Sequence, residues 1–268
     1  MRNLKSSSIY PLIRDTYIWL RDLPQLPGAY LHPWRCEGIR RLTALKDIHK
    51  GKRAFIIGNG PSLKNTDMAR LKGEITFGMN RIYLMFPELG FRTTYLSVVN
   101  DLVIEQTAAD LAALDMPKFL TWRSRKFFTN LQLSTSNLPT FLYSTYDSPR
   151  FSRDVRGRMW EGATVTYVTM QLAFHMGISE VYLIGVDHNY DTKGKPNTTI
   201  TSDGDDPNHF HAGYFGKGFR WQLPDLETSE IAYRMARQAY ENAGRRIADA
   251  TVGGKLTIFE KVDFNALF

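Results

Sequence analysis

The sequence predicts an α/β fold with a mainly parallel sheet, helices on both faces and a long lid segment. Two observations carry this prediction. From residue 53 on, short apolar runs typical of buried parallel strands alternate with longer helical segments. After Asp187, about forty residues rich in Gly, Asp, Asn, Thr and Pro interrupt the alternation, and loops of that length are usually functional.

The expected elements follow one another as strand and helix, which favours parallel strands joined by helical crossovers. In chain order the strands cover residues 53–58, 74–80, 93–100, 117–122, 140–145, 180–187 and 246–251. A helix is expected after Pro61, because proline suits the first helical turn. Further helices are expected over 101–115, 164–177 and 228–245, the last capped by Thr228 or Ser229.

We divide the chain into a basic, aromatic N-terminal arm, residues 1–50, and an α/β domain, residues 51–268, with the lid at 189–226. One piece of the arm, Tyr10 to Leu23, has an amphipathic pattern that fits a foot on a membrane surface. The alternative is an arm packed on the core or on a second subunit. We favour it because the run is short and rich in proline.

Composition restricts the class of partner. The net charge of +7 favours phosphate-bearing partners, but no regular array of aromatics and arginines predicts nucleic-acid binding. The single cysteine, Cys36, excludes an intrachain disulfide and fits a reducing cytoplasm. We expect a cytoplasmic protein, and the arm leaves association with the inner face of the membrane and a homo-oligomer open.

The loop Gly58-Asn59-Gly60-Pro61-Ser62 follows the first strand and fits no common nucleotide fingerprint. It lacks the Lys-Ser/Thr pair of a P-loop, the third glycine of a dinucleotide loop and the glycine flanks of a nucleophile elbow. What remains is a tight strand-to-helix turn whose backbone amides suit an anion.

Amide and carboxylate side chains stand at corresponding places in the sequence. The first strands end at Asn59, at Asn80 and at Asn100-Asp101, and a later one at Asp187. Carboxyl ends of parallel strands line one crevice, where ligands bind. Three carboxamides and few charges suit the recognition of a sugar and a base, although Asn also commonly starts turns.

These stretches carry a resemblance. The runs "IIGNGPSL", "GMNRIYL", "SVVND" and "GISEVYLIGVDHNY" resemble the bacterial sialyltransferases of glycosyltransferase family 42. They also resemble the domain-of-unknown-function family 115, which includes MptE-like 6-hydroxymethylpterin diphosphokinases and Maf proteins. The tail "YFGKGFRW…GRRIADATVGGKL" is similar to members of that family found with bacterial surface-polysaccharide genes.

The sialyltransferase resemblance implies a Rossmann-like (GT-A-like) fold and a CMP-activated nonulosonic acid, sialic acid-like or Kdo-like, as donor. It implies no required cofactor or metal, and a glycan or lipid-linked acceptor. The residues expected to bind nucleotide or donor are Gly58, Asn59, Gly60, Pro61, Ser62, Asn80, Asn100, Asp101, Thr164, Thr166, Gly185 and Asp187.

The lid supplies the expected catalytic groups. The family's lid has a tyrosine on the donor phosphate and a basic histidine three residues later, and Phe210 and Gly213 fall at those positions here. The candidate bases are therefore His209, His211 and His188, because an imidazole can take a proton near neutral pH. Tyr214, Lys217 and Arg220 are the candidates for stabilising the departing phosphate.

Two alternatives remain. An MptE-like pyrophosphokinase acting on a hydroxymethylpterin-like alcohol would need Mg²⁺, held by Asp187 with Asp203, Asp205 and Asp206. The third interpretation is a non-catalytic nucleotide-binding subunit, since no histidine stands at the family's position.

Overall fold

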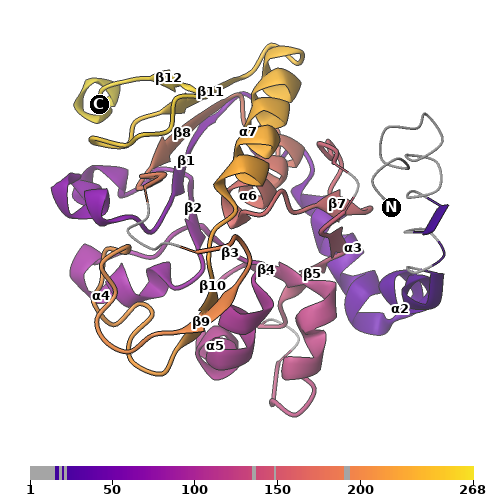
Figure 1. Cartoon of the computed structure of the whole chain (residues 1–268). Coiled ribbons are helices and arrows are strands. Elements are labelled where there is room, and N and C mark those ends of the chain that lie inside the picture. Colours follow the sequence, from indigo (N-terminus) through magenta and orange to yellow (C-terminus); the bar gives the residue numbers. More distant parts are fainter. Residues whose placement is uncertain (1–15, 18–19, 21–22, 135–136, 148, 190–193) are drawn as a thin grey trace, which may run out of the picture.

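A single parallel sheet of eight strands forms the centre of the molecule, in the order β12-β11-β8-β1-β2-β3-β4-β5 (Figure 1). The computed structural model describes residues 16–17, 20, 23–134, 137–147, 149–189 and 194–268. The strands are β1 (Arg53–Ile57), β2 (Thr76–Met79), β3 (Tyr95–Val98), β4 (Lys118–Thr121), β5 (Thr140–Leu142), β8 (Glu180–Ile184), β11 (Arg246–Asp249) and β12 (Glu260–Lys261). The predicted fold class is confirmed.

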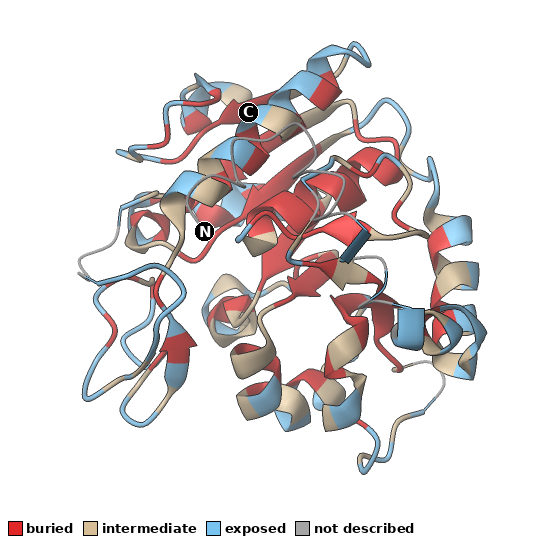
Figure 2. Ribbon diagram, turned by 45° about the vertical axis from the view of Figure 1, so that its right-hand side comes forward, coloured by how far each residue is buried: buried red, intermediate tan, exposed pale blue. Residues whose placement is uncertain are grey.

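The strands in the middle of the sheet are buried (Figure 2), and their alternate residues belong to two separate cores, one on each face. The first face lies under α6 (Val165–His175) and α7 (Leu226–Glu241), whose apolar sides share its core. The second face is covered by short helices: η2 (Pro61–Asn65), η3 (Met68–Leu71), η4 (Ile82–Met85), α4 (Phe86–Leu89) and α5 (Asp101–Ala113). Ala54, Ile56, Phe77 and Val181 belong to the first core, and Phe55, Ile57, Leu96 and Tyr182 to the second. Both faces are buried, as parallel strands require.

The order in which the chain adds strands to the sheet reverses at β1. From β1 the chain builds β2 to β5 on one side, and β8, β11 and β12 follow on the other. The carboxyl ends of β1 and β8 are therefore neighbours, with Ile57 paired to Ile184. Ligands of open α/β sheets bind at such a switch point, so the topology alone directs attention to the loops after these two strands.

Three expected elements differ from the structure. The helix after Pro61 is split into η2 and η3, because Thr66 between them has an extended backbone, φ −111° and ψ 126°, and its amide donates to Leu63. The expected fifth strand divides at Tyr143 into β5 and β6 (Ser144–Thr145), which pairs with β7 (Met159–Trp160). The last long helix begins at Leu226, capped by Asp225, rather than at Thr228 or Ser229.

The N-terminal arm is described in its second half, while nearly all of the expected helix Tyr10–Leu23 lies outside the described residues. Three helices follow there: η1 (Leu23–Gln25), α2 (Leu26–Leu31) and α3 (Pro33–Leu45). Helix α3 packs beside β5, where Trp34 stacks on Phe141 with ring centroids 5.8 Å apart. In the described part of the chain, no helix is long and apolar enough to cross a bilayer.

The lid contains structure of its own. Strands β9 (Thr199–Thr201) and β10 (Arg220–Gln222) form an antiparallel hairpin beside α5 (Figure 1). Backbone N–H and C=O groups of Arg220 both bond the Gln106 side chain, at 2.9 and 2.8 Å. The remaining elements are η5 (Trp122–Phe127) and the C-terminal η6 (Phe264–Leu267).

The close contact between the loops after β1 and β8 makes a first prediction. A Cβ atom on Gly58 would collide with the backbone carbonyl of Gly185, which cannot move without displacing β8. Gly58→Ala should therefore lower the free energy of unfolding by about 1–3 kcal/mol. In denaturant titrations, Gly157→Ala is the matched control, since its Cβ meets no atom within 4 Å. Equal stabilities of the two variants would contradict the prediction.

Candidate functional site

Polar residues from six segments line one cavity at the carboxyl edge of the sheet, beside the β1–β8 switch point. Of the expected site residues, the cavity brings together Gly58, Asn59, Gly60, Asn80, Thr164, Thr166, Gly185, Asp187, His188 and His209. The N-terminal ends of α6 and α7 form the opposite wall. The cavity measures about 110 Å³, whereas ordinary ligand pockets measure about 300–1,000 Å³. The cavity is therefore smaller than a pocket that holds a ligand of nucleotide size.

The loop after β1 is held by the chain's own carboxylate. Asp187 accepts from the Ser62 amide at 3.1 Å and from the Ser62 hydroxyl at 2.7 Å. The Gly60 amide donates to Gly185, the Leu63 amide donates to Gly60, and Pro61 has no amide hydrogen. Contrary to expectation, the amides of Gly60, Ser62 and Leu63 are not free for an anion. Its glycines instead let the two loops approach closely, since a Cβ on Gly60 would collide with the Asp187 carboxylate.

Two carboxamides facing the cavity have unmet hydrogen-bonding capacity. Asn59 is 9% exposed, and the buried Oδ1 atoms of Asn59 and Asn80 have no hydrogen-bond partner. Asn80 also has a left-handed backbone, φ 49°, as do the cavity residues Ala163 and His188. Strained backbone of this kind concentrates at functional sites. A ligand hydroxyl would satisfy these groups, because it can both donate and accept and so matches an amide in either orientation.

His209 forms a histidine–carboxylate pair within the lid. Its Nδ1 lies 2.7 Å from Oδ2 of Asp206, whose side chain is 3% exposed and also accepts from the amides of Asn208 and Phe215. Because the carboxylate accepts, we assign the Nδ1 proton to this bond, which makes Nε2 the basic nitrogen. The ring stacks on Tyr214, with centroids 4.0 Å apart. His209 is thus fixed in tautomer and in orientation.

A second histidine–carboxylate pair joins the loop after β8 to α7. Nε2 of His188 is 3.2 Å from Oε1 of Glu230 on α7, and the His188 side chain is 10% exposed. This hydrogen bond lowers the pKa of Glu230, and Arg234, 2.8 Å from the other carboxylate oxygen, adds to the effect. The ring of Tyr233 lies beside His188, with centroids 6.2 Å apart.

The lid is closed over the crevice through backbone contacts. The Phe210 amide donates to the Asn59 carbonyl at 2.9 Å, and the Arg81 guanidinium donates to the carbonyls of Gly213 and Tyr214. The lid aromatics Phe210, Tyr214, Phe215 and Trp221 are buried in the core of the second sheet face. Closure therefore depends on the loops after β1 and β2, which also carry the two asparagines of the cavity.

Several predicted residues lie elsewhere. His211, Lys217 and Arg220 are exposed on the lid: His211 accepts from the Gly213 amide, and Arg220 pairs with Glu105 at 3.0 Å. Tyr214 is itself a lid residue; its side chain is fully buried and does not line the cavity. None of the three groups expected to stabilise a departing phosphate faces the cavity, because the hairpin carries Arg220 toward α5 and the lid core takes Tyr214.

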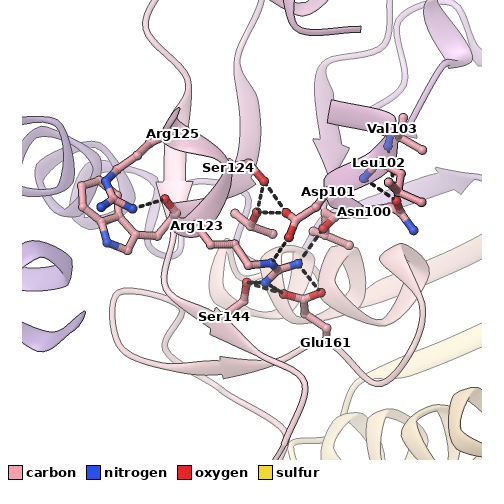
Figure 3. Close-up of polar contacts among 12 residues, drawn as sticks. Asn100, Asp101, Leu102, Val103, Arg123, Ser124, Arg125, Ser144 and Glu161 are labelled. Carbon is pink, nitrogen blue, oxygen red and sulfur yellow. Dashed lines mark hydrogen bonds and ion pairs between the residues drawn. The ribbon is translucent and has the colours of Figure 1, made fainter. Parts of the chain in front are cut away.

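Asn100 and Asp101 have structural contacts instead (Figure 3). Asn100 caps α5 by accepting from the amides of Leu102 and Val103. Asp101 lies 2.7 Å from Arg123, which also pairs with Glu161. Burial lowers the pKa of Arg123, but the neighbouring carboxylate of Glu161 outweighs burial and raises it overall. The ion pair fixes the turn at 161–163, whose last residue, Ala163, lines the cavity.

Sequence patterns missed part of the cavity wall. Asn208, Asp225, Ser229 and Tyr233 line the cavity, and Glu230 and Asp206 hold its histidines. The sequence offers one signal for these residues, since Asp206 and His209 are three positions apart. In the described residues, no group of three or more His, Cys, Asp or Glu side chains is arranged to hold a metal ion.

Comparison with solved structures shows a distant structural likeness. No family model and no curated protein matches the chain, so membership in family 115 stays a prediction. The structure of the Maf glycosyltransferase from Magnetospirillum magneticum AMB-1 is similar, with a TM-score of 0.48 and 16% sequence identity. The match covers 98% of this chain and 43% of that one, so this chain spans less than half of its length.

The ion pair behind the cavity wall makes a second prediction. Glu161 is 4% exposed at its side chain and holds Arg123, so Glu161→Gln should lower the free energy of unfolding by about 1.5–3 kcal/mol. Glu241→Gln removes the exposed partner of Arg237 and is the control, with an expected loss of at most about 0.5 kcal/mol. Chemical denaturation measures the free energy of unfolding of both variants. Equal losses would show that the buried ion pair stabilises the fold no more than the exposed one.

Proposed function

We propose that the chain is a glycosyltransferase that takes a sugar from a nucleotide-sugar donor. The observation that carries the proposal is the His209–Asp206 pair, which stands on a closed lid over a cavity walled by carboxamides at the sheet's switch point. A fixed imidazole with a basic Nε2 is suited to take a proton from an acceptor hydroxyl. The surrounding carboxamides suit hydroxyl-bearing ligands.

The second property of the proposed site is that a lid covers it. When closed it excludes water, which would otherwise compete with the acceptor for the donor. Its closure bonds to Asn59 and Arg81 lie next to the donor-facing side chains of Asn59 and Asn80. Donor binding and closure would therefore assist each other, since both depend on the same two loops.

The proposed donor is a CMP-activated nonulosonic acid, and the proposed product a bacterial surface glycan. The resemblance of the runs around Asn59, Asn80 and Asp187 to sialyltransferases supports this choice of nucleotide. The acceptor would be a glycan or a lipid-linked glycan reached from the cytoplasm at the inner face of the membrane. Asp187 and Asp206 already have protein donors, so the chemistry is proposed to proceed without a metal.

A thermal-shift screen tests the nucleotide. A ligand that binds only the folded state stabilises it by mass action, by about 2.7 kcal/mol at a hundredfold excess over its Kd. We expect CMP to raise the melting temperature equally with Mg²⁺ and with EDTA. A rise with ATP that needs Mg²⁺ would overturn the proposal in favour of pyrophosphoryl transfer, and no response to any nucleotide would exclude nucleotide binding and leave a scaffold role.

Replacing the base tests the chemistry. His209→Gln should lower the rate of CMP release from CMP-N-acetylneuraminic acid in the presence of an acceptor by about 10²–10⁴-fold. The nucleotide affinity should change little, since the side chain is proposed to act on the acceptor. The exposed His211→Gln, two residues away, is the control and should retain the wild-type rate. A His209→Gln enzyme as active as that control would exclude His209 as the base.

A further inference from the structure

The cavity lacks an obvious partner for the donor's phosphate. No lysine or arginine is among the described residues that line it. In the turn after β1 the amides of Gly60, Ser62 and Leu63 donate to protein acceptors, and Lys217, Arg220 and Tyr214 lie outside the cavity. Glycosyl transfer from a nucleotide-sugar nonetheless leaves charge on the departing phosphate, and such charge needs a placed donor or cation.

His188 is the cavity residue that can supply positive charge from outside the lid. It lies directly after Asp187, and its backbone is left-handed, with φ 54°. Glu230 bonds its Nε2 at 3.2 Å, which leaves Nδ1 as the second ring nitrogen. In the protonated imidazole both ring nitrogens donate, so that Nε2 can bond Glu230 while Nδ1 donates to a phosphate oxygen.

The charged and titratable groups around His188 come from three segments. Glu230 and, behind it, Arg234 come from α7, and Tyr233 stands beside the ring. Asp187 is adjacent in sequence, but its carboxylate is bonded to Ser62. The Lys255 ammonium lies 3.3 Å from the Asn189 side chain, on the exposed side of the same loop.

The N-terminus of α6 meets the same corner of the cavity. Thr164 caps this helix, and its hydroxyl lies 3.4 Å from the phenol of Tyr233, which connects it to His188. The partial positive charge of a helix N-terminus favours an anion. The buried and unpartnered Asn59 side chain faces the cavity as well, so this part of the site has capacity for a ligand.

We propose that His188 contacts the donor's phosphate and assists its departure. Glu230 is the positioning residue, because its carboxylate orients the His188 ring. The inference rests on the proposed glycosyl transfer. In that reaction the bond between the anomeric carbon and the phosphate oxygen breaks, and its electron pair stays on the phosphate. The acceptor oxygen bonds the anomeric carbon, and its proton passes to Nε2 of His209. His188 donates a hydrogen bond to the phosphate oxygens and need not release its proton.

The test compares CMP with cytidine, which lacks the phosphate. Isothermal titration calorimetry gives both Kd values, and their ratio is the contribution of the phosphate. His188→Asn is the informative variant, because asparagine also adopts the left-handed backbone required at this position. We expect this variant to reduce the ratio by about ten- to a hundredfold, while the Kd of cytidine stays within about twofold.

Glu230 has a matched pair of variants. Glu230→Gln should reduce the ratio, and Glu230→Asp, which keeps the carboxylate, should restore part of it. His211→Gln, the exposed lid histidine, should match the wild type in every respect.

The outcomes separate this inference from the proposed function. A ratio unchanged in His188→Asn, with CMP bound tightly by the wild type, overturns the role of His188 and leaves the transferase intact. A wild type that binds neither CMP nor cytidine overturns the proposed CMP donor and, with it, the inference. A reduced ratio in His188→Asn but not in Glu230→Gln retains His188 and excludes Glu230 as the positioning residue.

Discussion

The contact between Ser62 and the carboxylate of Asp187 is the constraint on which the candidate site depends. It joins the loops after β1 and β8 at the switch point of the sheet, and the glycines at 58, 60 and 185 leave room for it. The carboxylate occupies the position that a phosphate takes in many nucleotide-binding turns. The loop thus becomes a rigid wall with a carboxamide, Asn59, as its functional group.

In this arrangement the residues that can carry charge toward a ligand are histidines outside the loop after β1. The two histidine–carboxylate pairs belong to different segments around the cavity, His209 on the lid and His188 against α7. Each imidazole has one nitrogen fixed by a carboxylate, which sets the role of the other. The proposed base and the proposed phosphate contact are thereby held on separate elements.

The sequence predicted the fold well, because buried parallel strands are continuous apolar runs and helices have their own period, and both patterns can be recognised locally. It predicted the cavity in part. Asn59, Asn80 and Asn100 look alike at strand ends, but Asn100 caps α5, and capping and ligand binding use the same side-chain groups. The Ser62 amide was expected to be free because its acceptor, Asp187, lies 125 residues further along the chain. His209 and His211 could not be ranked until the fold of the lid brought Asp206 to one of them.

The central claim is that one nucleotide-sugar occupies the cavity between the β1 turn, the α6 N-terminus and the closed lid. Hydrogen–deuterium exchange with and without CMP, in EDTA, tests it most directly. The account predicts slower amide exchange in three separated segments, residues 78–81, 162–167 and 206–215, and unchanged exchange in α3. Protection confined to other parts of the chain, or protection that appears only when Mg²⁺ is added, would contradict it.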